Sequence, residues 1–405
     1  MSLRVAILAH GFVPQYRLRL YELLNARQGA EYVIFHGTPP FDVGSRAAEE
    51  PFPFPEKRVE NHEFRIGGWS VVYQPVIRAI LSGNYDAVVL GHEIRFISNV
   101  FLALMCKLSG IAVLYWGFGY HYDLRFGADL DDKSKGWRVR IVAALKGVLT
   151  RLADGYLAYT RDGVEKLVKT GFARDHIYIL QNTIDVAGQI KLHEALKRVT
   201  HGAIRAQCQL RPDSVVFLFI GRLISLKGAD MLIEALKRIG ARKRSSQFVE
   251  TLIVGAGPEE ERLKAMAKEV PGVRFLGELP PGEEVARYMK VAAAVIIPGG
   301  VGLASVHAFA HGRPMITRQH RMHGPEVNYI THNENGLIIE GGIDEFAEEL
   351  ARFANSPDWQ QRLADGALRA RDEFRIERMA ERFDEAVQLT VAQIHRRHIA
   401  PAGTR

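Results

Sequence analysis

The residues best suited to chemistry are two cations in the second half of the chain, Arg222 and Lys227, within Gly221-Arg-Leu-Ile-Ser-Leu-Lys-Gly228. The continuous apolar run at residues 215–220 predicts a buried strand before them. Arg222 would project from the end of this strand, and Lys227 would stand at the mouth of the next helix. A guanidinium fork and a mobile ammonium beside free helix amides can hold a diphosphate. Gly221 would let the backbone approach that ligand. The alternative is a pair of surface cations near a helix start.

The composition indicates a globular protein of two domains. The chain has 405 residues, 47% apolar and 24% charged, which is too long for one ordinary core. The net charge of +7 favours anionic partners such as phosphate, nucleic acid or acidic lipid, without choosing among them. Cys106 and Cys208 lie in apolar or helical surroundings without CxxC spacing. We therefore expect reduced, buried thiols rather than a disulfide or a metal site.

We expect a cytoplasmic protein, with any membrane contact peripheral and on the cytoplasmic face. The apolar run within residues 1–8 is too short for a secretory signal. The longest candidate span, residues 94–115, is broken by polar residues and predicts a helix followed by a buried strand.

The elements that must position the two cations alternate along the chain. Apolar runs separated by helical patterns predict parallel sheets covered on both faces. In the first half the predicted strands are 4–9, 32–36, 87–90, 112–116, 155–158 and 177–180, with a helix over 18–24 and a loop excursion over 41–65. In the second half they are 215–220, 251–254, 273–276, 293–297, 314–317 and 336–339, with a long helical region from about 357.

This repetition predicts an α/β fold of two Rossmann-like, doubly wound parallel-sheet domains that face each other. We place an N-terminal, acceptor-side domain at residues 1–195 and a C-terminal donor-binding domain at 196–380. A final helix at 381–405 is free to pack back on the N-terminal domain. The linker lies near 185–212. Because such sheets bind ligands at the carboxyl ends of their strands, the cleft between the domains is the expected site.

The order of motifs resembles the retaining glycosyltransferases of family 4, which have the two-domain GT-B architecture. The resemblance covers most of the chain and is most specific from residue 177 to 340. Besides the segment Gly221–Gly228 it rests on Gln181-Asn-Thr-Ile-Asp185, Gly255-Ala-Gly-Pro-Glu259, Phe275-Leu-Gly-Glu278, Pro298, Gly302-Leu303, Pro325-Glu326 and Asn335-Gly-Leu337.

The resemblance implies a hexosyltransferase (EC 2.4) of surface polysaccharide or glycolipid synthesis. It would move a sugar from a UDP, GDP or dTDP donor to a glycan or lipid-linked acceptor. Arg222 and Lys227 would stabilise the leaving diphosphate, so neither a metal nor a cofactor beyond the co-substrate is expected, and nucleic acid is not an expected partner. Transfer would proceed by front-face attack, with the leaving phosphate helping to deprotonate the acceptor.

The other donor-binding positions follow from the same resemblance. Glu278 and Leu279 stand where the family holds the nucleotide base, and Gly11 matches a small-residue loop near the phosphate. Glu326 matches an acidic position near the donor and would equally suit a helix cap. The turn Gly299-Gly-Val-Gly-Leu303 either offers helix amides to the pyrophosphate or is only a tight turn. The complete predicted set is Gly11, Gly221, Arg222, Lys227, Gly255, Glu278, Leu279, Gly299, Gly302, Leu303, His307 and Glu326.

The chain departs from the family at its Glu-x7-Glu signature. These carboxylates, which contact the donor sugar and the nucleotide ribose, align with Gly299 and His307. His307 can still hydrogen-bond a ribose hydroxyl, whereas Gly299 can offer only backbone. We interpret the change as a variant subfamily with a different sugar contact. The alternatives are altered catalysis with a structural His307, a GT-B-fold nucleotide-sugar epimerase, and a non-catalytic nucleotide-sugar-binding scaffold.

In the first domain the candidates follow the strands. Tyr16 and Arg17, on the first helix, would face the cleft and contact acceptor or phosphate, unless Arg17 is a surface cation. Trp116 opens Trp116-Gly-Phe-Gly-Tyr-His121, where aromatic groups can approach a sugar. His121 is the candidate active-site histidine and His92 the second, and an ordinary loop histidine is the alternative for each.

Two further patterns in the first half of the chain are similar to a metal site and to a membrane-binding helix. Asp129-Leu-Asp131-Asp132 is similar to the metal-binding Asp-x-Asp of single-Rossmann transferases. Acidic residues are also common before a helix, so we expect no metal there. The predicted helix over 133–152 has basic and apolar faces suited to acidic lipid. The alternative is a core-covering helix with a solvated charged face.

Overall fold

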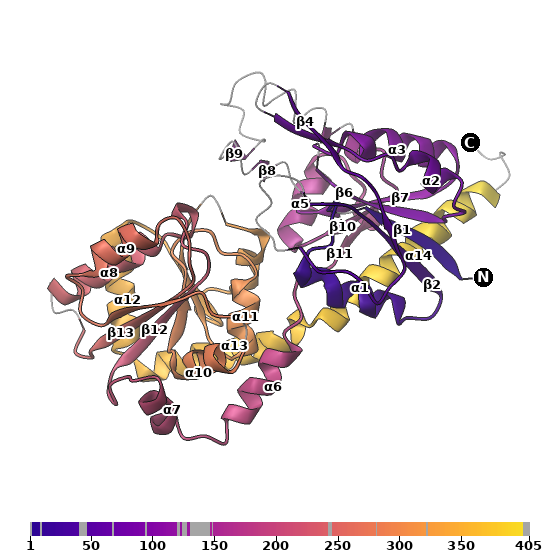
Figure 1. Ribbon diagram of the computed structural model, residues 1–405. Coiled ribbons are helices and arrows are strands. Elements are labelled where there is room, and N and C mark those ends of the chain that lie inside the picture. The colour runs from indigo at the N-terminus through magenta and orange to yellow at the C-terminus, as the bar shows by residue number, and fades with distance from the viewer. Residues whose placement is uncertain are drawn as a thin grey trace. The chain divides into compact units, whose positions relative to one another are not determined.

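The computed structural model describes residues 2–8, 10–39, 47–66, 69–93, 95–119, 122–123, 128–129, 146–147, 149–241, 245–280, 282–320 and 323–399. By its contacts the chain divides into two compact units: Met1–Ile184 with Ile376–Arg405, and Asp185–Arg375. Each unit contains one large parallel sheet with helices packed on it (Figure 1). The predicted fold class of two parallel-sheet α/β domains is confirmed.

The first unit is built on seven parallel strands in the order β11-β10-β7-β6-β1-β2-β3. Their bounds are β1 Leu3–Leu8, β2 Ala30–His36, β3 Glu56–Arg58, β6 Ala87–Gly91, β7 Ala112–Gly117, β10 Gly155–Ala158 and β11 Ile177–Ile179. The strand order reverses between β1 and β6. Ligands of doubly wound sheets bind at such a switch point, so the loops after β1 and β6 are the expected binding loops of this unit.

Alternate residues of β1 enter two different cores, as the two-residue period of a strand requires. Val5 and Ile7 pack with α1 (Leu18–Asn25) and α14 (Ile376–Ile399). Ala6 and Leu8 pack with α2 (Ile77–Leu81), α3 (Ile97–Leu108) and α5 (Arg161–Lys169). These two helix layers therefore cover opposite faces of the sheet. The remaining elements of the unit are η1 Gln15–Arg17, β4 His62–Ile66, β5 Trp69–Tyr73, β8 Tyr122–Asp123, β9 Ala128–Asp129 and η2 Arg174–His176.

The predicted loop over residues 41–65 is wrong where the chain forms β3 and β4. β3 pairs in parallel with β2, and β4 forms an antiparallel hairpin with β5. The sequence hides β3 because its three side chains, Glu56-Lys-Arg58, are charged and exposed. An edge strand is held by main-chain hydrogen bonds and needs no apolar pattern.

The second unit contains six parallel strands in the order β14-β13-β12-β15-β16-β17. Their bounds are β12 Val215–Ile220, β13 Val249–Val254, β14 Val273–Gly277, β15 Ala294–Ile296, β16 Met315–Arg318 and β17 Gly336–Ile339. In chain order this sheet reads 3-2-1-4-5-6, the Rossmann arrangement, and its switch point lies between β12 and β15.

The helices of the second unit include two that the sequence prediction assigned to a linker. They are α6 (Ala187–Leu196), which packs on α10 and α11, and α7 (His201–Gln207), which packs on α10. The others are η3 Ser225–Lys227, α8 Ala229–Ala241, α9 Glu260–Ala267, α10 Glu283–Val291, α11 Ala304–Ala310, η4 Pro325–Tyr329, α12 Ile343–Ala354, α13 Pro357–Arg371 and η5 Asp372–Phe374.

The unit boundaries lie at 184/185 and 375/376, whereas the sequence placed them at 195/196 and 380/381. The first boundary is earlier because α6 packs with the second unit. The last helix, α14, packs on α1, β7, β10 and β11 of the first unit. Cys106 and Cys208 are buried and unpaired. Within the described part of the chain, every helix is too short or too polar to traverse a bilayer.

Candidate functional site

The switch point of the second unit joins the two loops that carry its main candidate residues. The loop after β12 contains Lys227, and the loop after β15 contains Gly299. The Gly299 N–H donates to Lys227 O at 3.1 Å, and the Gly300 N–H donates to Leu226 O at 2.7 Å. The Lys227 ammonium closes the loop pair by donating to Gly300 O at 2.6 Å. The structure thus brings Lys227 and the glycine-rich turn together at the edge where a Rossmann sheet binds its ligand.

Lys227 ends the 3-10 turn η3, and Gly228, with φ of 69°, leads from it into α8. The side chain is half-buried. Burial lowers the pKa of its ammonium, and the nearby Glu326 carboxylate opposes this shift. Glu326 is itself buried, in η4, with Oε2 close to Gly302 and Gly324. A desolvated cation interacts strongly with an anion that enters its surroundings.

Packing requires a glycine at position 299. This requirement is independent of the carboxylate that the resembled family has at the corresponding position. A Cβ added there would collide with the Leu226 carbonyl oxygen and lie 2.8 Å from the Lys227 carbonyl carbon. The expectation that Gly299 offers its backbone to the donor is wrong for its N–H, because Lys227 O already accepts that hydrogen. The turn therefore shapes the loop that holds Lys227.

His323 fixes the other end of the turn, and sequence reasoning missed it. The Val301 N–H donates to His323 Nδ1 at 3.1 Å, and Nε2–H donates to Arg318 O at 2.8 Å. This pattern requires the neutral ring, and burial lowers the pKa of His323 accordingly. Gly302 and Leu303 then lead into α11. The only sequence signal was a histidine shortly after a strand, which is too common to single out.

The loops after β12, β13 and β14 meet at the same carboxyl edge. The Gly221 N–H donates to Val254 O at 3.0 Å, and the Gly255 N–H donates to Gly277 O at 2.7 Å. A Cβ at Gly255 would collide with Gly221 O, so only glycine permits this approach. Arg222 follows β12 and is exposed. Glu278 and Leu279 follow β14, and Glu278 is exposed whereas Leu279 is half-buried. The predicted phosphate and base positions therefore share one sheet edge.

His307 lies on α11, is half-buried and faces Gln189 of α6. The Gln189 amide is 3.4 Å from His307 Nδ1. When the amide nitrogen points to Val186 O and Asp185 O, at 3.2 and 3.3 Å, its oxygen accepts the Nδ1 hydrogen. Burial lowers the pKa of His307 to about 4. The imidazole is then neutral at physiological pH, with Nε2 as an acceptor for a ligand hydroxyl.

Two further histidines, His193 of α6 and His311 after α11, pack edge to face with ring centroids 6.1 Å apart. Both are buried. Burial, and then the positive charge of Arg313, lowers the pKa of His193 to about 4. Burial, and then His193, lowers that of His311 to about 3.

This pair predicts that acid destabilises the protein. Below pH 6.5 the unfolded chain binds protons at both histidines, whereas the folded chain binds them only near pH 4 and 3. The free energy of unfolding should therefore fall between those limits by about 1.4 kcal/mol per pH unit per histidine. Urea unfolding of the protein and of His311→Leu at several pH values measures this slope. Because His311→Leu removes one of the two histidines, the slope of its unfolding free energy against pH should be smaller by about 1.4 kcal/mol per pH unit. An unchanged slope would show that His311 does not have a lowered pKa in the folded protein.

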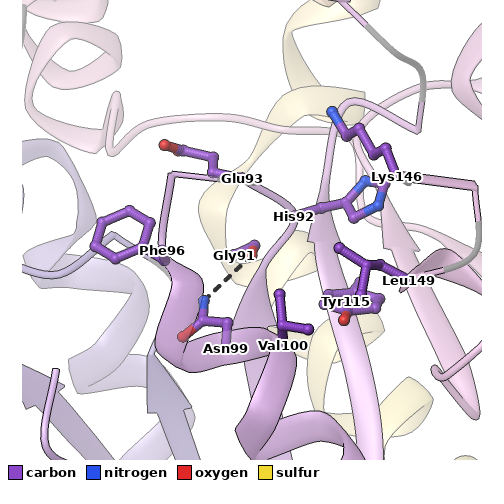
Figure 2. A pocket seen from close by; sticks show the side chains of 9 residues that line it. All are labelled: Gly91, His92, Glu93, Phe96, Asn99, Val100, Tyr115, Lys146 and Leu149. Atoms are coloured by element: carbon purple, nitrogen blue, oxygen red, sulfur yellow. Dashed lines mark hydrogen bonds between the residues drawn. The ribbon is translucent and has the colours of Figure 1, made fainter. Parts of the chain in front are cut away.

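The candidates of the first unit lie after β1, β6 and β7. Gly11, with φ of 74°, packs so closely on Phe96 that a Cβ would lie 2.8 Å from its ring. His92 lines a pocket at the end of β6 (Figure 2). The pocket is lined by Gly91, His92, Glu93, Phe96, Asn99, Val100, Tyr115, Lys146 and Leu149.

His92 is held through both ring nitrogens. Nδ1 accepts from the Tyr156 hydroxyl at 2.8 Å. Nε2 lies 2.9 Å from Thr150 Oγ1, which donates its own hydrogen to Lys146 O, so Nε2–H is the donor. As a result, both ring nitrogens of His92 are already engaged within the protein.

Two predicted acceptor contacts are corrected by burial. Arg17 is fully buried, bonded to Thr183 O, Asn182 Oδ1 and the Tyr159 hydroxyl. Trp116 is 2% exposed and stacks under the Arg17 guanidinium at 4.7 Å. Distant segments thus supply the hydrogen-bond acceptors and aromatic rings that stabilise this cation inside the unit, and neither Arg17 nor Trp116 is exposed to contact an acceptor sugar. Tyr16 is half-buried beside Arg17.

The remaining candidates lie outside the described residues. They are His121, Asp131 and Asp132, together with most of the predicted helix over 133–152. Among the residues that the structure does describe, no three His, Cys, Asp or Glu side chains are grouped to hold a metal ion.

Comparison with known proteins finds a family match over the segment that contains the β12/β15 switch point. Residues 214–356 match the family of glycosyl transferases group 1. A D-inositol 3-phosphate glycosyltransferase from Kribbella flavida is 29% identical over 233 residues, which cover 53% of this chain and 52% of that protein. The chain thus spans about half the length of such curated relatives.

Solved structures of GT-B glycosyltransferases share the fold of the whole chain. Anabaena Alr3699/HepE in complex with UDP has a TM-score of 0.66 at 16% identity, covering 96% of this chain and all of its own. Sucrose-phosphate synthase from Thermosynechococcus elongatus has a TM-score of 0.61 at 18% identity, covering 99% and 100%. The predicted GT-B fold is therefore confirmed.

Proposed function

We propose that the protein is a glycosyltransferase that moves a hexose-type sugar from a nucleotide diphosphate to a glycan or lipid-linked acceptor. The observation that carries this proposal is the half-buried Lys227 ammonium at the β12/β15 switch point, with Arg222 exposed at the end of β12. The group 1 match over residues 214–356 supports it. So do the structures of Anabaena Alr3699/HepE, which were solved in complex with UDP and with UDP-glucose.

The proposed chemistry needs charge stabilisation more than a protein nucleophile. The bond between the sugar C1 and the phosphate oxygen breaks, and a bond from C1 to the acceptor oxygen forms. The acceptor proton passes to the leaving phosphate, on the face from which the acceptor attacks, so that the anomeric configuration is retained. Lys227 and Arg222 would stabilise the charge that develops on the diphosphate, in place of a metal ion. His307 Nε2 would accept a hydrogen bond from the nucleotide ribose.

The test is release of the nucleotide diphosphate from UDP-, GDP- and dTDP-hexoses, with and without a glycan or lipid-linked acceptor. Acceptor-dependent release from one donor, unchanged by a metal chelator, supports the proposal. Isomerisation of the sugar without an acceptor would identify an epimerase instead. Binding of a nucleotide sugar without turnover would identify a scaffold. NMR of the product anomer decides whether configuration is retained.

A further inference from the structure

Helix α3 of the first unit presents an apolar stripe to solvent. Ile97, Phe101, Leu104 and Leu108 are 42, 55, 43 and 74% exposed. Their spacing of four, three and four residues places them along one side of the helix. The opposite side is fully buried in the core against the sheet, through Leu102, Ala103 and Cys106. The helix therefore has a core-facing side and a second, unpartnered apolar side.

The same surface continues over the elements beside α3. Helix α2 packs next to α3 (Figure 1). Strand β5 of the hairpin also packs against α3. In the hairpin register Phe64 lies opposite Val71 and Tyr73 opposite His62, so these residues share one face. The other face carries the fully buried Val72. The apolar face of the hairpin therefore points outward.

Nine large apolar side chains are exposed in the described part of the chain, and seven of them belong to these neighbouring elements. We call these seven the α3 face: Phe64, Tyr73, Leu81, Ile97, Phe101, Leu104 and Leu108. The other two are Phe118 and Leu389. Scattered apolar side chains are normal on a protein surface, but a contiguous group of this size marks an interaction site.

The charged residues of α2 and α3 are basic, and the exposed Glu93 just before α3 pairs with Arg95 at 2.6 Å. Neither α2 (Ile-Arg-Ala-Ile-Leu) nor α3 (Ile-Ser-Asn-Val-Phe-Leu-Ala-Leu-Met-Cys-Lys-Leu) contains an acidic residue. Arg78 of α2 is exposed. Lys107 donates to Leu152 O at 3.3 Å, which places the exposed Arg151 beside this end of α3. The acidic partner of Lys107, Asp154, is buried. An anionic surface would therefore meet cations around an apolar centre.

We propose that the α3 face docks on the surface of an anionic lipid bilayer. Its apolar side chains would enter the boundary between headgroups and acyl chains, with Arg78, Lys107 and Arg151 at the level of the phosphates. The helix lies in the interface rather than across it, because α3 has 12 residues and a span needs about 20. Asn99 and Val100 of the same helix line the pocket beside His92 (Figure 2), so docking would bring that pocket to the membrane surface. The inference does not depend on the proposed transfer reaction.

Flotation of the full chain with vesicles tests the proposal. The protein should float with vesicles of phosphatidylcholine and phosphatidylglycerol in equal parts, and much less with phosphatidylcholine alone. The affinity of the double variant Leu104→Ser/Leu108→Ser for the mixed vesicles should be lower by about tenfold or more. Leu389→Ser is the matched control, because Leu389 has the same 43% exposure as Leu104 and lies on α14, on the opposite face of the sheet. The control should bind like the unaltered protein, and thermal melting checks that both variants are folded.

Three outcomes would overturn the proposal. The folded double variant floats as well as the unaltered protein, or neutral vesicles bind the protein as strongly as mixed ones. In the third, vesicle binding is absent and light scattering shows a dimer that the double variant cannot form. The α3 face would then be a contact between two copies of the chain.

Discussion

Replacing Lys227 by methionine is expected to lower acceptor-dependent nucleotide release by about tenfold to thousandfold. Methionine keeps an apolar stem of similar length and removes the charge that would stabilise the leaving diphosphate. It also removes the hydrogen bond to Gly300 O. Arg222→Ala should reduce release within the same range, through loss of the second cation. The turnover rate at saturating donor is the quantity to measure.

The matched control for Lys227→Met is Lys237→Met. Lys237 is a half-exposed lysine of α8 that pairs with Glu269 at 3.3 Å, away from the switch point. A surface pair of this kind contributes little to stability, so turnover and melting temperature should stay unchanged. Full turnover in both Lys227→Met and Arg222→Ala would show that these cations do not hold the donor diphosphate.

Replacing Gly299 by alanine is the second change with a large expected effect. The new methyl group would collide with the Leu226 carbonyl and displace the backbone that carries Lys227. Overpacking at such a contact destabilises a protein by about 1–3 kcal/mol. Because the displaced loop holds the ammonium, we expect release to fall about tenfold or more even where the protein stays folded. Gly299→Glu should be worse, although it restores the carboxylate typical of the resembled family.

Gly240→Ala is the control for this substitution. Gly240 lies in α8, and a Cβ there meets no atom within 4 Å. Alanine is the better helix former, so this variant should be as stable as the unaltered protein or slightly more stable. If Gly299→Glu raised nucleotide release, the turn would have room for a carboxylate and the packing argument would fail.

The sequence predicted the place of Lys227 well because local patterns determine it. The run Val215–Ile220 is apolar throughout, so it becomes a buried strand, and the following Gly-Arg must lie at its carboxyl end. The departure at Gly299 was also visible as a missing carboxylate. Its physical reason was not visible, because the contact with Leu226 O joins segments about seventy residues apart in the chain.

Arg17 shows the limit of reading charge from sequence. An arginine on an early helix is usually solvated, yet here the guanidinium is enclosed by Asn182, Thr183 and Tyr159. Each partner is more than 140 residues away, so no local pattern announces it. The edge strand β3 was missed for a related reason. Its pairing with β2 uses main-chain groups, which every sequence possesses.

The packing of α14 determines how the polypeptide can mature during its synthesis. The first unit is discontinuous in the chain, since the second unit is inserted between Ile184 and Ile376. Met379, Phe383 and Val387 of α14 belong to one core of the first unit. Synthesis runs from the N-terminus, so the part of the first sheet that α14 covers stays exposed while the whole inserted unit is made, although α1 already packs on the same face. The inserted unit is therefore the first to complete its own core. The core of the first unit is completed only after α14 has been synthesised.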